Sequence, residues 1–180
     1  MSELEGQCMC GAVTVTATRA EPVVRACHCD MCRRWTSSMF MSVPTQSGSS
    51  TITGPAKTFR LSDWAERGFC DTCGSALWYA TVHDDHKNLA AGLFDNAAGN
   101  TLTLEFFSDL KPEGYVLSGD HKRLTAAETI ALFPPDEGGD ARPTIMLNRH
   151  GPRRPTADPW PHRDTSHGQT GRPTIGWGRE

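Results

Sequence analysis

Seven cysteines in three short clusters constrain this chain more than any other feature of its sequence. All of them precede residue 74 of a 180-residue chain, at positions Cys8 and Cys10, Cys27, Cys29 and Cys32, and Cys70 and Cys73. An odd number of cysteines in such tight clusters is a poor disulfide framework, because residues two apart are badly placed to bridge each other. The pattern instead favours metal ligands, and clustered thiolates are typical of zinc.

The remaining composition predicts a cytoplasmic protein. The first five residues are acidic and lack the basic and then apolar pattern of a signal peptide. No apolar run reaches the roughly 20 residues that span a bilayer. Thiols stay reduced in the cytoplasm, which again favours metal binding. The formal net charge of −3 has no strong bias along the chain, so neither a nucleic-acid nor a membrane partner is expected. The oligomeric state is left open.

Glycine placement divides the cysteines into two sites. Gly11 directly follows Cys10, and Gly74 directly follows Cys73. A metal-binding turn bends sharply around its ion, and glycine adopts the required backbone angles without a Cβ penalty. We therefore predict a closed, structural zinc site made of the four cysteines of these two clusters: Cys8, Cys10, Cys70 and Cys73.

The remaining cluster has three cysteines, Cys27, Cys29 and Cys32, and no glycine after it. Three protein ligands with one open position are typical of catalytic zinc, so we predict a second zinc ion here and two per chain. Two alternatives stay open. His28 or Asp30 supplies a fourth ligand and closes the site, or the three thiols form a metal-free redox cluster.

Two arginines follow this cluster. A zinc ion held by three thiolates carries a formal charge of −1, and the guanidinium groups of Arg33 and Arg34 would offset it and hold an anionic substrate. An ordinary solvated basic pair is the alternative. The neighbouring Trp35 is interpreted as a core residue.

The chain around the cysteines reads as short strands. Residues 12–17 alternate apolar and polar side chains at period two, as a half-buried strand does. Further strands are predicted over 23–26, 39–43, 50–52, 58–61, 76–82, 88–94 and 101–107, separated by turn residues. Eight short strands at close spacing predict a mainly β fold of antiparallel strands.

One short helix closes the predicted domain. Thr125 and Glu128 have the spacing of a capping box, and the apolar run after them continues to Phe133 before two prolines. Beyond it, residues 135–180 are rich in proline, arginine and glycine and poor in apolar side chains. We predict a zinc-binding domain over residues 1–134 and a disordered tail over 135–180.

Three motifs resemble the glutathione-dependent formaldehyde-activating enzyme family, which also includes centromere protein V. They are GQCMCGAV at 6–13, CHCDMCRR at 27–34 and RGFCDTCG at 67–74. The resemblance implies a β-tent fold, a structural zinc on the four-cysteine set and an active-site zinc on the three-cysteine set. It also implies a carbon–sulfur lyase that reversibly joins a thiol such as glutathione to an aldehyde, formaldehyde in the named case. The alternative function is a zinc-stabilised, non-catalytic binding module.

Overall fold

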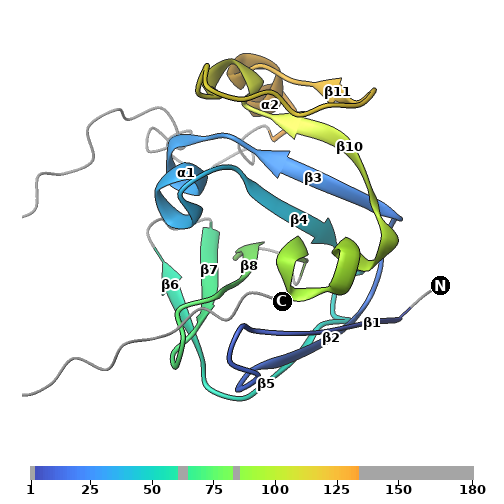
Figure 1. Ribbon diagram of the computed structural model, residues 1–180, viewed down its shortest axis with the longest axis vertical. Helices are drawn as coiled ribbons and strands as arrows, with labels where there is room; N and C mark the ends of the chain where they lie inside the picture. The colour runs from blue at the N-terminus through green and yellow to red at the C-terminus, as the bar shows by residue number, and fades with distance from the viewer. Residues whose placement is uncertain (1–2, 61–64, 83–85, 134–180) are drawn as a thin grey trace, which may run out of the picture. The chain divides into compact units, whose positions relative to one another are not determined.

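The computed structural model describes residues 3–60, 65–82 and 86–133, all in the first of the two units into which the chain divides, Met1–Arg149. The described strands form two sheets, one with the order β1-β2-β5 and one with the order β11-β10-β3-β4-β9-β8-β7-β6 (Figure 1). The strands are β1 (Glu3–Gln7), β2 (Thr14–Thr18), β3 (Val23–Cys27), β4 (Phe40–Pro44), β5 (Thr51–Thr53), β6 (Ala56–Arg60), β7 (Ala65–Cys70), β8 (Ala76–Thr81), β9 (Lys87–Ala90), β10 (Thr101–Phe106) and β11 (Lys122–Arg123). The helices are α1 (Asp30–Thr36) and α2 (Ala126–Ala131), with 3-10 turns η1 (Ala91–Leu93), η2 (Asp95–Gly99) and η3 (Ser108–Leu110).

The mainly β fold is confirmed, and every predicted strand is present. Most neighbouring strands are antiparallel, whereas β10 runs parallel to both β3 and β11. The parallel pairing places Glu105 opposite Ala26, and Phe106 opposite Cys27. This register brings the end of β10 beside the second cysteine cluster, although about 80 residues separate them in the sequence.

Three strands lack the pattern that the sequence analysis used. β1 has one buried apolar side chain, Leu4, and β7 buries Arg67 and Gly68 in the middle of the sheet. The two-residue β11 is exposed. The predicted strand 88–94 ends at Ala90, because its pairing with β4 stops there and the chain turns into η1.

Helix α1 was not predicted, and it carries part of the second cysteine cluster. Cys29 is its N-cap, and the Cys29 sulfur accepts a hydrogen bond from the Cys32 backbone N–H at 3.5 Å. The side-chain oxygen of Ser, Thr, Asp or Asn usually fills this role. The helix ends at Thr36, and its C-cap, Ser37, has a left-handed φ of 65°. A cysteine in the capping position is thus compatible with both helix formation and metal binding.

Helix α2 confirms the predicted capping box. The Thr125 hydroxyl oxygen accepts from the Glu128 backbone N–H, and the Glu128 carboxylate accepts from the Thr125 N–H at 2.8 Å. The helix ends at Ala131, two residues before the expected end, and the side chains of Leu132 and Phe133 are exposed. The predicted tail 135–180 lies outside the described residues. Within the described ranges, the helices are too short and polar to cross a bilayer.

The pairing of β7 with β8 explains a glycine in the third motif. Gly68 faces Trp78 across the two strands, and a Cβ built on Gly68 would lie 2.2 Å from the indole ring. Trp78 is buried, so its ring has little room to move. The glycine is therefore required by close packing, since its backbone has no positive φ.

We expect Gly68→Ala to lower the free energy of unfolding by about 1–3 kcal/mol, because the new methyl group overpacks the Trp78 ring. Gly92→Ala is the matched control, since nothing lies within 4 Å of a Cβ at Gly92. Denaturant titration of both variants at one zinc concentration measures the difference. Equal stability of the two variants would show that the sheet adjusts to the added methyl group.

Candidate metal centres

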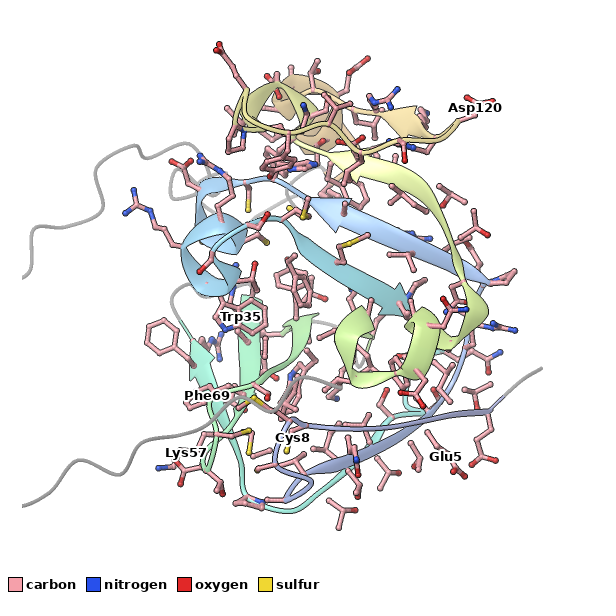
Figure 2. All side chains as sticks on the ribbon, viewed as in Figure 1. Glu5, Cys8, Trp35, Lys57, Phe69 and Asp120 are labelled. Atoms are coloured by element: carbon pink, nitrogen blue, oxygen red, sulfur yellow. The ribbon has the colours of Figure 1, made fainter. Side chains whose placement is uncertain are left out.

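The four-cysteine centre joins the two sheets. Its four sulfur atoms, from Cys8, Cys10, Cys70 and Cys73, all lie within 4.8 Å of one another. Cys8 directly follows β1 of the three-stranded sheet, and Cys70 ends β7 of the eight-stranded sheet. Cys8 and Phe69, the residue before Cys70, are labelled near this junction in Figure 2. The structure therefore brings together the four cysteines that the sequence analysis paired.

Two similar turns present these sulfurs. The Gly11 N–H donates to the Cys8 carbonyl at 3.0 Å, and the Gly74 N–H donates to the Cys70 carbonyl at 2.9 Å. The φ angles of the two glycines are +74° and +75°. Both angles lie in the left-handed region that favours glycine. The conformational reason given for these glycines is confirmed.

Hydrogen-bond donors favour the thiolate form of two cysteines in the four-cysteine centre, Cys8 and Cys73. The Val13 N–H donates to the Cys8 sulfur at 3.3 Å. The Ser75 hydroxyl lies 3.2 Å from the Cys73 sulfur, and its hydrogen bond lowers the pKa of Cys73 to about 5. Cys10 is exposed, so water also reaches this centre. The donor set fits zinc, which prefers four thiolates in a closed structural site.

The three-cysteine centre lies where β3 meets α1. Cys27 ends β3, Cys29 caps α1 and Cys32 lies in its first turn, with the three sulfurs within 4.8 Å of one another. Cys29 and Cys32 are buried, with 2% and 4% of their surface exposed. Cys27 is partly exposed, and no cysteine of this centre is exposed as Cys10 is in the four-cysteine centre.

The three thiols share their protons unequally. Hydrogen bonds from the thiols of Cys27 and Cys32 lower the pKa of Cys29 to about 3. The hydrogen bond to Cys29 correspondingly raises the pKa of Cys27 well above its ordinary value. The Cys29 thiolate is thus stabilised by hydrogen bonds that the neighbouring thiols donate. A zinc ion in this position would release those protons and take all three sulfurs as ligands.

Neither alternative fourth ligand joins this centre. The His28 ring is directed elsewhere, with Nε2 2.8 Å from Glu105 and Nδ1 3.4 Å from the Tyr115 hydroxyl. Asp30 forms an ion pair with Arg33. Among the described residues, the sulfurs of the cluster have no further His, Asp or Glu ligand atom within reach. The donor set is therefore three thiols with one position left for another ligand.

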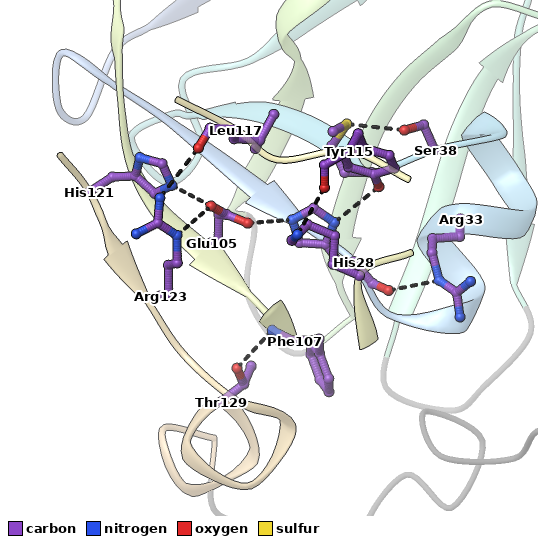
Figure 3. Close-up of polar contacts among 12 residues, drawn as sticks. His28, Arg33, Ser38, Glu105, Phe107, Tyr115, Leu117, His121, Arg123 and Thr129 are labelled. Carbon is purple, nitrogen blue, oxygen red and sulfur yellow. Dashed lines mark hydrogen bonds and ion pairs between the residues drawn. The ribbon is translucent and has the colours of Figure 1, made fainter. Parts of the chain in front are cut away.

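His28 belongs to a buried polar network (Figure 3). Glu105 is fully buried and contacts His28, His121 and Arg123. Burial lowers the pKa of His28, which favours the neutral ring. Burial opposes ionisation of Glu105, but hydrogen bonds from His121 and His28 outweigh it and lower the pKa of Glu105. The network fixes the His28 ring orientation beside the cluster.

The sequence analysis missed Glu105. In β10 it alternates with Leu102 and Leu104, so period two places it on the same face as the exposed residues Thr101 and Thr103. The chain after β10 covers that face at its end, through Tyr115, His121 and Arg123. Only the tertiary structure shows this covering.

A surface cleft of about 270 Å³ lies against α1. Its lining residues are Asp30, Arg33, Arg34, Ser37, Ser38, Pro112 and Tyr115. Arg33 is half-buried, donates to the His28 carbonyl at 3.0 Å and pairs with Asp30, whereas Arg34 is exposed. None of the three cysteines lines the cleft. Helix α1 nevertheless contains Arg33, Arg34 and Cys32, and Cys29 is its N-cap. The two predicted substrate-binding arginines thus share one cleft.

We expect Glu105→Gln to reduce the free energy of unfolding by about 1.5–3 kcal/mol, since it removes the charge from buried hydrogen bonds to three partners. Folding lowers the pKa of Glu105. The stability that the carboxylate contributes is therefore fully present above the ordinary pKa of a glutamate and is lost as pH falls through the lower pKa of the folded state. Glu21→Gln is the control, because its ion pair with Arg25 is exposed and contributes less than about 1 kcal/mol. Denaturant titrations at neutral and acidic pH measure the free energy of unfolding of both variants. Equal losses of this free energy in the two variants at neutral pH would contradict a stabilising role for the buried network.

Comparison with known proteins shows which family this chain resembles. The family described as glutathione-dependent formaldehyde-activating enzyme matches residues 3–109. An uncharacterized lyase of Schizosaccharomyces pombe is 34% identical over 132 residues, covering 72% of this chain and 96% of that protein. A Halomonas elongata protein, provisionally named as a glutathione-dependent formaldehyde-activating enzyme, is 29% identical over 85 residues, covering 42% of this chain and 54% of its own. A crystal structure of a Rhodobacter sphaeroides protein superposes with a TM-score of 0.46 at 17% identity, covering 56% of this chain and all of that chain, a likeness too weak to support an argument. The extent of the family match and of the Schizosaccharomyces similarity shows that this chain belongs to the glutathione-dependent formaldehyde-activating enzyme family.

Proposed function

We propose that the chain binds two zinc ions with different roles. Cys8, Cys10, Cys70 and Cys73 would hold a structural ion, and Cys27, Cys29 and Cys32 would hold an ion with an open position. Support comes from the two sulfur clusters, from the glycine turns of the first and from the lack of a fourth ligand at the second among the described residues. The first ion would link two sheets, so its binding free energy would also be folding free energy.

Substitutions in the two centres should separate folding from function. We expect Cys73→Ala to lower the melting temperature strongly or to give insoluble protein, because it removes a ligand from the ion between the sheets. Cys29→Ala should keep the four-cysteine zinc and lose the other, with a smaller loss of stability. Zinc analysis and thermal melting of each variant test this assignment. A Cys29→Ala protein that melts below Cys73→Ala would reverse the two roles.

We further propose that the protein is a carbon–sulfur lyase acting on the adduct of a glutathione-like thiol and an aldehyde. The observation that carries this proposal is an incomplete three-thiol ligand set, two of whose cysteines belong to the helix and N-cap of α1, which also contributes two arginines to a cleft. Family membership and the names of both relatives support the reaction class. A non-catalytic module would have no need for a ligand set with an open position.

The reaction forms or breaks one carbon–sulfur bond. When bound at the open centre, zinc lowers the pKa of a substrate thiol. The sulfur electron pair attacks the aldehyde carbon, the carbonyl electrons move to oxygen, and that oxygen takes up a proton. The reverse reaction returns the same electrons and proton, so neither reactant is oxidised and no redox cofactor is required. The protein contributes mainly by holding the two reactants together.

The cleft would hold the anionic part of the thiol. Glutathione carries two carboxylates, and Arg33 and Arg34 are cationic groups in the cleft. Arg33 already pairs with Asp30 and is held by the His28 carbonyl, so it is positioned before a ligand arrives. Arg34 is exposed, so its contribution is reduced by solvent.

The double variant Arg33→Gln/Arg34→Gln should bind glutathione about 1–3 kcal/mol more weakly, because two charged hydrogen-bond donors are lost at a partly exposed site. Its zinc content should equal that of the wild type, since neither arginine is a ligand. Arg25→Gln is the control, because Arg25 also forms a surface ion pair but does not line the cleft. Isothermal calorimetry measures the affinities.

Calorimetry with S-methylglutathione tests the sulfur contact itself, because the thioether cannot become a thiolate. We expect it to bind more weakly than glutathione to the wild-type protein and to be inactive as a substrate in a thiol–aldehyde assay. If both compounds bind equally and the assay shows no turnover, the lyase proposal fails and a zinc-stabilised binding module is favoured.

A further inference from the structure

Arg67, in the middle of β7, is a buried cation. It is 5% exposed, and among the described residues it forms no ion pair with a carboxylate. Its Nε atom is buried without a hydrogen-bond partner in the part of the chain that the structure describes. A buried arginine is rare unless it is paired, because removing its charge from water is costly. Its counter-charge therefore needs an explanation.

The surroundings of Arg67 place its guanidinium against α1. The Arg67 Nη2 atom lies 3.8 Å from the sulfur of Met31, which sits between the ligand candidates Cys29 and Cys32. The guanidinium carbon lies 5.7 Å from the Trp35 ring centroid and 5.5 Å from that of Tyr79. Trp35 belongs to the same helix and is labelled in Figure 2. Aromatic faces and a thioether stabilise the cation only weakly compared with a full negative charge.

Thiolates of the three-cysteine centre would supply this negative charge. Met31, which contacts the guanidinium, lies between Cys29 and Cys32 at the start of α1, so Arg67 packs against the helical turn that carries two of the three sulfurs. Three thiolates and one zinc ion carry a formal charge of −1, and Arg67 cancels it. A fourth thiolate from a substrate would return the charge to −1 instead of raising it to −2. This balance matters because the centre is buried.

We propose that Arg67 is the counter-cation of the three-cysteine zinc centre and that its charge allows this buried site to hold zinc and accept an anionic thiolate. The role is one of positioning and electrostatics, since Arg67 has no contact with the cleft. The inference rests on the zinc site proposed above, but it does not depend on the reaction.

The four-cysteine centre shows why only one site needs such a residue. Four thiolates and zinc carry a formal charge of −2, yet Cys10 is exposed and Cys73 is partly exposed. Water therefore stabilises the charge there, together with the Val13 and Ser75 donors. At the three-cysteine centre, where Cys29 and Cys32 are buried and Cys27 is partly exposed, a fixed cation would take the place of much of this water.

The test compares Arg67→Met with Arg67→Lys in the full chain loaded with zinc. Methionine is flexible and fills irregular apolar space without charge, whereas lysine keeps the charge without the planar guanidinium. Competition with a chelator measures zinc affinity at both centres in one protein. The Cys29→Ala variant, which keeps the four-cysteine centre, identifies the signal of each ion.

We expect Arg67→Met to weaken zinc binding at the three-cysteine centre about 10–100-fold, the effect typical of residues that support metal ligands. Zinc binding at the four-cysteine centre should be unchanged, and Arg67→Lys should retain affinity within a few-fold of wild type. Glutathione affinity of zinc-saturated Arg67→Met should also fall. If Arg67→Met does not fold, Arg67→Gln provides the same neutral comparison.

Two results would overturn the proposal. One is wild-type zinc affinity at the three-cysteine centre in a folded neutral variant. The other is an equal loss in the lysine and methionine variants, which would assign the effect to packing between Trp35 and Tyr79 instead of charge. Zinc affinity is measured without thiol or aldehyde, so a failed lyase assay would not contradict the role of Arg67. Unchanged zinc affinity in the Arg67 variants would likewise not contradict the lyase proposal, which is tested by the thiol–aldehyde assay.

Discussion

The approach of four cysteines across the junction between two sheets is the constraint on which the described structure depends. Cys8 and Cys10 follow a strand of the small sheet, whereas Cys70 ends a strand of the large sheet and Cys73 follows it. Contacts between residues so far apart in the sequence are entropically costly to form. A metal ion shared by both clusters would offset that cost directly, which short strands with small apolar faces do only in part.

The second cluster is built on a different physical principle. Its cysteines belong to one strand end and one helix, so local geometry alone brings the sulfurs together. Local structure alone does not explain how a largely buried site tolerates the negative charge of its thiolates. Long-range packing meets that need through Arg67 from β7, while the His28–Glu105 network from β10 fixes the orientation of the His28 ring.

The cleft and the three-cysteine cluster together would determine which ligands the site binds. Helix α1 presents its cysteines toward the interior and its arginines toward the surface. A ligand that carries both a thiol and carboxylates has matching groups for the two features. A neutral thiol or a simple carboxylate matches only one of them. The division of one short helix into two chemically different faces is therefore the basis of the proposed specificity.

The sequence by itself determined the mainly β fold, the division of seven cysteines into sets of four and three, and the capping box of α2. These features follow from local patterns: glycine after cysteine, period-two alternation, and a threonine three residues before a glutamate. Only the tertiary structure decided that Glu105 is buried and that Arg67 lies beside the cysteine-bearing helix. A charged residue in a strand reads as exposed in any local pattern, because its burial depends on which distant segment covers that face of the sheet.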